Sequence, residues 1–165
     1  MADTAAHDAF EALAPRLEPT MLIVTARTGD ERSGCLVGFH AQCSISPLRY
    51  LVLLSTANHT WGVARHTSHL VVHFCDERDL ELAWLFGGAT GDQIDKFAEC
   101  DWEDGPAGAP VLTQCRTWLE GRVLEQHPLG DHVAFVLEWT AGRADRGFRP
   151  LRLPSVDDVT AGHPA

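Results

Sequence analysis

The chain has 165 residues, of which 45% are hydrophobic and 22% charged, with 23 Asp and Glu against 13 Lys and Arg. This length suits one ordinary domain with its own core, and the composition is globular, neither disordered nor membrane-spanning. The formal net charge of −10 repels nucleic-acid phosphates and anionic membrane surfaces, so we expect neither as a partner.

The N-terminal segment, residues 1–18, predicts a helix. Phe10, Leu13 and Leu17 recur in it at helical spacing before Pro19. The segment carries acids but no basic block followed by an apolar run, so it is not a secretory signal. We therefore expect a cytoplasmic location.

Strands dominate the rest of the chain. Short apolar runs predict strands at residues 21–26, 34–39, 51–54 and 70–74, and the glycine- and proline-rich segment 102–110 predicts a loop. Two longer strands, 118–125 and 133–140, form a hairpin through the sequence HPLGDH. Since no strict βαβ alternation occurs, the sequence predicts an antiparallel barrel that is mainly β with helical insertions.

Helices are predicted between these strands. Residues 58–65 fit a short helix, and residues 77–86 fit a clearer one that ends at a pair of glycines. Asp92 is the predicted N-cap of a third helix, which contains Ile94 and Phe97.

The cysteines and histidines do not predict a metal site. The five cysteines form no CxxC pair, so they are expected as free thiols, with Cys35 and Cys75 in the core. His66, His69 and His73 resemble a metal cluster, but the last two lie on one strand, about 13 Å apart at roughly 3.3 Å per residue. We expect His73 to be a satisfied histidine in the core or at a pocket edge.

Residues 34–47, GCLVGFHAQCSISP, form an apolar strand that breaks into a polar loop of small residues and stops at Pro47. Such a loop lets backbone amides approach a flat or anionic ligand closely, because no bulky side chain intervenes. It is a candidate cofactor cradle that contains Cys43; an ordinary strand end with turn residues is the simpler interpretation.

A second candidate lies at the start of the helix at 58–65. Asn58, His59 and Thr60 follow an apolar strand, where a helix leaves unpaired amide groups that favour an anion. The alternative is a plain N-cap made by Asn58 or Thr56.

Together with ANHT at 57–60, GDQIDKF at 91–97 and GDH at 130–132, the stretch at 34–47 resembles the flavin reductase-like family. The resemblance covers residues 19–143, with the segments in the family's order and spacing. It implies one domain over residues 1–165 with an antiparallel split β-barrel of the FMN-binding type.

The resemblance also implies roles for single residues. Ala41, Gln42, Cys43 and Ser44 match positions that line the isoalloxazine edge and ribityl chain, and the cofactor-binding set includes their neighbours Phe39 and His40. The remaining implied contacts are Asn58, His59 and Thr60 at the FMN phosphate and Lys96 at the flavin tail. His132 is the candidate catalytic residue, which acts as an acid, positions nicotinamide or supports its loop. By itself, Lys96 fits a solvated helix charge and His132 an exposed turn residue.

The sequence departs from the family pattern at two places. Leu48 replaces the second proline of a Pro-Pro pair, and the C-terminal tail, residues 144–165, diverges from a strand that often closes over the active site of reductases in the family.

The implied function is an FMN-binding flavin reductase that transfers hydride from NAD(P)H to flavin, with FAD as an alternative cofactor and a partner monooxygenase as a recipient of electrons. No GxGxxG fingerprint occurs, so NAD(P)H is expected over the flavin. A homodimer is implied, with Trp61 and Trp84 as interface or core residues. The alternatives are a non-catalytic flavin carrier or sensor and a deazaflavin-dependent oxidoreductase of the same barrel.

Overall fold

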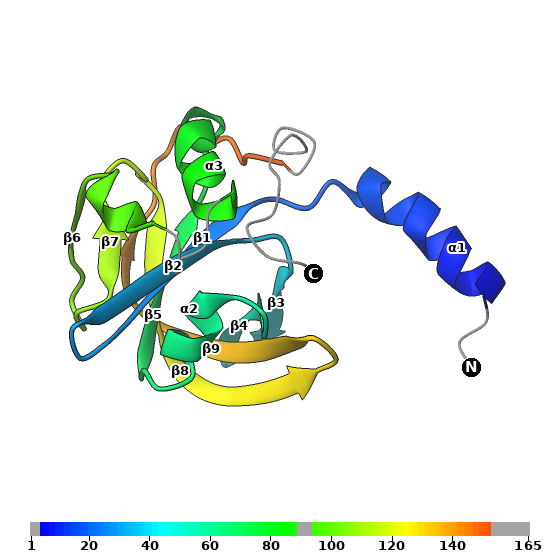
Figure 1. Ribbon diagram of the computed structural model, residues 1–165, viewed down its shortest axis with the longest axis horizontal. Helices are drawn as coiled ribbons and strands as arrows, with labels where there is room; N and C mark the ends of the chain where they lie inside the picture. Colours follow the sequence, from blue (N-terminus) through cyan, green and yellow to red (C-terminus); the bar gives the residue numbers. More distant parts are fainter. Residues whose placement is uncertain (1–3, 89–93, 153–165) are drawn as a thin grey trace.

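A computed structural model describes residues 4–88 and 94–152 of the chain. Its main feature is a seven-stranded antiparallel sheet with the strand order β2-β1-β5-β8-β9-β4-β3 (Figure 1). The strands are β1 (Leu22–Thr28), β2 (Glu31–Val37), β3 (His40–Ile45), β4 (Leu48–Ser55), β5 (His69–Phe74), β8 (Trp118–Leu129) and β9 (His132–Arg143). The edge strands β2 and β3 do not pair with each other in the described residues, so the barrel is open there.

Two tight turns connect strands into hairpins, and the second of these hairpins is the predicted one. Gly29 joins β1 to β2 at a φ of 58°, and Gly130 joins β8 to β9 at a φ of 67°. Glycine adopts these left-handed values without the steric cost of a side chain. The hairpin of β8 and β9 is longer than predicted, because β8 continues to Leu129 and β9 begins at His132.

Helices lie on both sides of β1 and β2 (Figure 1). The α-helices are α1 (Thr4–Leu13), α2 (His59–Ala64) and α3 (Leu80–Gly88), and the 3-10 helices are η1 (Ala14–Leu17), η2 (Glu77–Asp79) and η3 (Lys96–Ala98). The predicted helix at the N-terminus is confirmed over its described residues; α1 leads away from the sheet and buries no side chain. No helix in the described ranges is long and apolar enough to cross a membrane.

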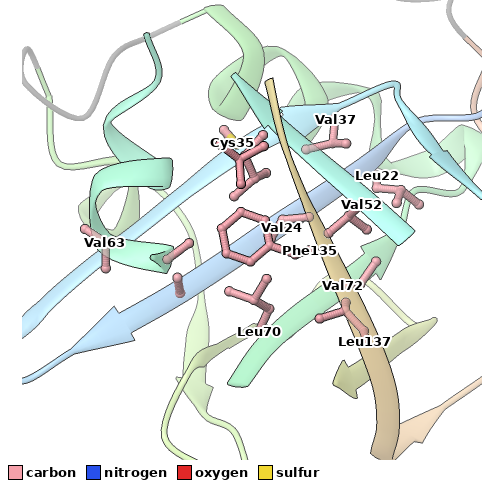
Figure 2. Packing of buried hydrophobic residues seen from close by; sticks show 14 residues of the cluster. Leu22, Val24, Cys35, Val37, Val52, Val63, Leu70, Val72, Phe135 and Leu137 are labelled. Atoms are coloured by element: carbon pink, nitrogen blue, oxygen red, sulfur yellow. The ribbon is translucent and has the colours of Figure 1, made fainter. Parts of the chain in front are cut away.

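The core has two layers because β1 is buried on both faces. Leu22, Val24 and Ala26 point to one side, where they pack with α2 and with Phe135 of β9 (Figure 2). Met21 and Ile23 point to the other side and pack with α3. Alternation of side chains along a strand produces this division, and it explains why β1 reads as a continuous apolar run.

The segment after β9 returns to the second layer of the core. Leu151 is 2% exposed, its carbonyl accepts a hydrogen bond from the Met21 N–H at 2.8 Å, and its own N–H donates to the Cys75 carbonyl at 2.8 Å. Residues 144–152 are therefore part of the folded body.

Three predictions were wrong in detail. Residues 40–45 form edge strand β3, with a bulge between Gln42 and Ser44, and not a loop, because their backbone pairs with β4. The predicted loop at 102–110 contains β6 (Trp102–Asp104) and the start of β7 (Pro110–Leu112), which pair with each other. Asp92 lies outside the described residues; Asp95 caps a single 3-10 turn, and Ile94 precedes it.

The predictions for the buried thiols and for His73 are confirmed. Cys35 and Cys75 are buried, whereas Cys43 is exposed on β3. The His73 ring is 0% exposed; its Nδ1 donates to the Ile23 carbonyl at 3.0 Å, and its Nε2 accepts from the Leu112 N–H at 2.9 Å. Burial lowers the pKa of His73 to about 4.

Candidate functional site

A hollow of about 430 Å³ lies where three elements far apart in the sequence meet. The start of β2, the first turn of α2 and the helix η3 form its walls. It is lined by Asp30, Glu31, Arg32, Ser33, Gly34, His59, Ile94, Asp95, Lys96 and Phe97. Two of the predicted cofactor residues, His59 and Lys96, thus share one hollow although 37 positions separate them in the printed sequence.

The first turn of α2 is held by two hydrogen bonds. Asn58 is in an extended conformation, and its Oδ1 accepts from the Thr60 N–H at 2.9 Å, which confirms it as the N-cap. Thr60 is 1% exposed, and its hydroxyl lies 2.9 Å from the Ser33 hydroxyl. His59 forms an ion pair with Glu31 at 2.9 Å when protonated. These contacts fix α2 against β2 at the rim of the hollow.

Replacing Asn58 by alanine is expected to lower the free energy of unfolding by about 1 kcal/mol, since the Thr60 N–H loses its acceptor. Urea unfolding measures this loss. Asn58→Asp is the matched control, because its carboxylate keeps an acceptor at the same place. Equal losses in both variants would contradict the assignment of the cap.

Lys96 is buried at the floor of the site, with 4% of its surface exposed. Its ammonium donates to the Gly34 carbonyl at 3.1 Å and to the Phe86 carbonyl at 3.0 Å, and it lies 5.5 Å from the centre of the Phe86 ring. Burial lowers the pKa of Lys96. The solvated helix charge is therefore excluded: Lys96 connects β2, α3 and η3.

Arg32 is a member of the site that the sequence analysis missed. Its guanidinium lies 4.6 Å from the Trp102 ring centre and 5.5 Å from that of Phe97, and its Nη2 reaches Asp95 at 3.4 Å. Its Nε is buried and has no hydrogen-bond partner among the residues that the structure describes. A buried donor without an acceptor is costly. Arg32 also lines the hollow, and this position makes its guanidinium a candidate for binding an anion.

The predicted residues of β3 lie elsewhere. Gln42, Cys43 and Ser44 line a second hollow of about 570 Å³, together with Ile45 and Ser46. Ala41 is exposed beside them. The structure therefore does not bring this group into the hollow of Lys96.

His40 acts as a tether between strands. Its Nδ1 lies 2.7 Å from the Tyr50 hydroxyl, and its Nε2 lies 2.7 Å from the Thr20 carbonyl. Burial lowers the pKa of His40. With both ring nitrogens occupied, His40 holds β3 to β4 and to the start of β1.

His132 is placed at the rim of the sheet next to Phe39. The two ring centres are 5.2 Å apart, and the Nδ1 of His132 lies 2.7 Å from an Asp131 carboxylate oxygen. This pairing lowers the pKa of Asp131. The Asp131 carbonyl accepts from the Thr56 N–H at 2.9 Å, which ties the hairpin turn to the segment that leads into α2.

The model of the "Flavin reductase like domain" family matches residues 15–153. The chain belongs to this family. The match includes every predicted site residue and extends beyond the region of the resemblance on both sides.

Curated relatives agree with this membership. The reductase subunit Stc3 of stachydrine N-demethylase from Rhizobium meliloti is 27% identical over 122 residues, 72% of this chain and 52% of that protein. The FMN reductase (NADH) RutF from Methylorubrum extorquens is 29% identical over 126 residues, 75% of this chain and 60% of that protein. This flavin reductase-like chain thus spans between half and three-fifths of the length of these two relatives.

Solved structures share the fold. An NADH:FAD oxidoreductase, SgcE6, from Streptomyces globisporus superposes with a TM-score of 0.79 at 18% identity, over 91% of this chain and 89% of that one. An FMN-binding protein from Thermus thermophilus gives 0.72 at 23% identity, over 78% and 73%. The antiparallel split barrel of the flavin reductase type is therefore confirmed.

Proposed function

We propose that this flavin reductase-like chain binds FMN and catalyses its reduction by NADH or NADPH. The observation that carries the proposal is the hollow beside Lys96, where residues of the family's matched region place Arg32, Lys96 and the Ser33 hydroxyl together. Three carboxylates also line it; Glu31 lies within ion-pair distance of His59, and Asp95 pairs with Arg32. Arg32 lines this hollow, and its guanidinium suits an anionic group such as a flavin phosphate. The relative RutF is named an FMN reductase that uses NADH, and SgcE6 is named an NADH:FAD oxidoreductase, so FAD remains the alternative flavin.

In this proposal, the residues of the hollow hold the phosphate end of the flavin. Arg32 supplies a guanidinium, and the first turn of α2, from Asn58 to Thr60, supplies the rim. Lys96 holds the Gly34 backbone in place through the hydrogen bond that its ammonium donates to the Gly34 carbonyl. Phe39 and the segment Ala41–Ser44 are proposed to line the edge of the isoalloxazine ring, which would supply the hydride-accepting chemistry when bound.

His132 is proposed as the catalytic residue of the open flavin face. Its ring is next to Phe39, and 20% of its side chain is exposed. The side chain is therefore largely buried but accessible to a ligand. Asp131 orients the imidazole through its Nδ1, which directs the other ring nitrogen away from Asp131. When protonated, an imidazole held in this way can donate a hydrogen bond from Nε2 to a group that gains electron density, whereas the neutral ring accepts there.

Anaerobic stopped-flow reduction of the FMN-loaded chain tests the function. Rapid loss of the flavin's visible absorption with NADH or NADPH would support the reductase and identify its donor. Bound FMN that neither donor bleaches would contradict the proposal in favour of a flavin carrier or sensor. Failure to bind FMN, with binding of a deazaflavin instead, would contradict it in favour of the other cofactor.

Replacing His132 by alanine is expected to slow reduction about tenfold or more, because general acid or hydrogen-bond assistance is lost, while the FMN dissociation constant changes less than about twofold. His127→Ala is the matched control: His127 is exposed on the same hairpin, where it pairs with Glu125 at 2.6 Å. Weakened FMN binding with an unchanged reduction rate would make His132 a binding residue.

We further propose a cytoplasmic homodimer that supplies reduced flavin to a monooxygenase. A relative from Klebsiella oxytoca, 26% identical over 74% of this chain and 72% of that protein, is named a 4-hydroxyphenylacetate 3-monooxygenase reductase component. Exposed apolar side chains at the β3 edge, Phe39, Ile45 and Leu48, support a contact with a second copy. Trp84 is 46% exposed and Trp61 packs against the core, so Trp84 is the better interface candidate of the two.

A further inference from the structure

A third hollow, which has arginines in its walls, lies at the end of the sheet away from His132. It has a volume of about 610 Å³ and is lined by Thr113, Arg116, Arg143, Ala144, Asp145 and Arg146. From His132 to Arg143, β9 extends over eleven steps, about 35 Å along the strand at roughly 3.3 Å per residue. The hollow is therefore far from His132 along β9, and it shares no lining residue with the hollow of Lys96.

The three arginines of this hollow carry charge that the protein neutralises only in part, through the electrostatic interaction of Arg116 with Asp145. Among the described residues, no carboxylate lies within ion-pair distance of Arg116, Arg143 or Arg146. The chain has 23 acidic residues against 13 basic ones, so three unpaired guanidinium groups around one hollow are an unusual concentration of positive charge. Such a concentration attracts anions.

The acid that lines the hollow is already occupied. Asp145 accepts from Nη2 of Arg78 at 2.8 Å and from the Gly147 N–H at 3.2 Å. Its backbone N–H donates to the Thr117 hydroxyl at 3.0 Å. Asp145 thus shapes the turn after β9, and its charge is compensated mainly by the ion pair with Arg78 and in part by Arg116.

One of the arginines is held in place. The Nε of Arg143 donates to the Arg116 carbonyl at 3.2 Å, which orients the guanidinium and leaves its two terminal nitrogens for a ligand. The planar fork of a guanidinium matches two phosphate oxygens, so a fixed arginine can bind phosphate in a bidentate manner. Thr113 adds a hydroxyl that can donate to a third oxygen.

We propose that the hollow between the β7–β8 loop and the turn after β9 binds a small molecule through a phosphate group. Three guanidinium groups suit a diphosphate better than a monophosphate, because each phosphate can engage a separate arginine. The site is distinct from the one proposed for FMN, and it does not depend on flavin binding.

Isothermal titration calorimetry of the chain with inorganic pyrophosphate, in the absence and in the presence of FMN, tests the site. We expect saturable binding with about one site per chain, and weaker binding of inorganic phosphate. The double variant Arg116→Gln/Arg146→Gln is expected to bind pyrophosphate at least tenfold more weakly. Arg65→Gln is the control, since Arg65 lies over Trp61 in α2, and it should bind like the unmodified chain.

Four outcomes of the pyrophosphate titrations would overturn the proposal. The first is an absence of saturable binding, and the second is equal affinity in the double variant and the unmodified chain. The third is a loss of affinity in the Arg65 control. The fourth is binding that only FMN-free protein shows, which would place the pyrophosphate in the flavin hollow. Circular dichroism and FMN affinity of the double variant confirm that it folds. Binding of a poly-glutamate peptide without binding of pyrophosphate would also overturn it, in favour of an acidic protein partner.

Discussion

Replacing Lys96 by methionine is expected to lower the free energy of unfolding by about 3 kcal/mol. Methionine has a similar length but no donor, so the carbonyls of Gly34 and Phe86 lose a charge-assisted hydrogen bond each while they stay buried. Relief from burying the ammonium offsets part of this loss. Urea unfolding of the flavin-free protein measures the change.

The control for this variant is Arg65→Met, which removes an exposed cation over Trp61 and should change stability by less than about 0.5 kcal/mol. If Lys96→Met is as stable as the unmodified chain, Lys96 does not clamp the three elements together. Loss of FMN affinity at unchanged stability would make Lys96 a direct ligand of the flavin, as the family resemblance implies. The two measurements therefore separate a structural role from a binding role.

The unmodified protein is expected to lose about 2 kcal/mol of stability between pH 7 and pH 5 through His73 alone. The folded state keeps His73 neutral until about pH 4, because burial opposes its charge and the Leu112 N–H occupies its Nε2. The unfolded chain takes up the proton near the ordinary pKa of 6.5. Protons therefore favour unfolding across this window, and stability falls as the pH falls from 7 towards 4.

Urea unfolding at pH 7 and pH 5 measures this effect. His73→Gln should remove most of the pH dependence, at a cost of about 2 to 3 kcal/mol at pH 7 from imperfectly replaced hydrogen bonds. His127→Gln, at an exposed position, should keep it. A slope that is the same in His73→Gln and in the unmodified chain would assign the pH dependence to other groups.

The sequence was informative where a local pattern decides the structure. An apolar run predicts strand β1, and a cap residue predicts the start of α2 at Asn58. Apolar runs and a turn glycine predict the hairpin of β8 and β9. The edge strand β3 was missed because its residues are polar and small, which is typical of loops. An edge strand is half solvated, so its side chains need not alternate with apolar ones.

The contacts of the site required the three-dimensional structure. Arg32 lies between the strands predicted at residues 21–26 and 34–39, and nothing local predicts that its guanidinium lies over the Trp102 ring. Lys96 follows an aspartate on a polar segment, which is typical of a solvated charge, yet its partners are 62 and 10 residues away. Long-range hydrogen bonds of this kind leave no periodic signal in the sequence.

The return of residues 149–152 to the second core layer has a consequence for the order in which the protein is made. Leu151 packs with Met21 and Ile23, and β9 separates β8 from β4 in the sheet. Strand β1 is therefore synthesised long before the last residues that pack against it. Its apolar side chains stay exposed until residue 151 has left the ribosome. Folding that depends on such distant pairs is slow, so nascent chains of this protein are expected to need protection from aggregation during synthesis.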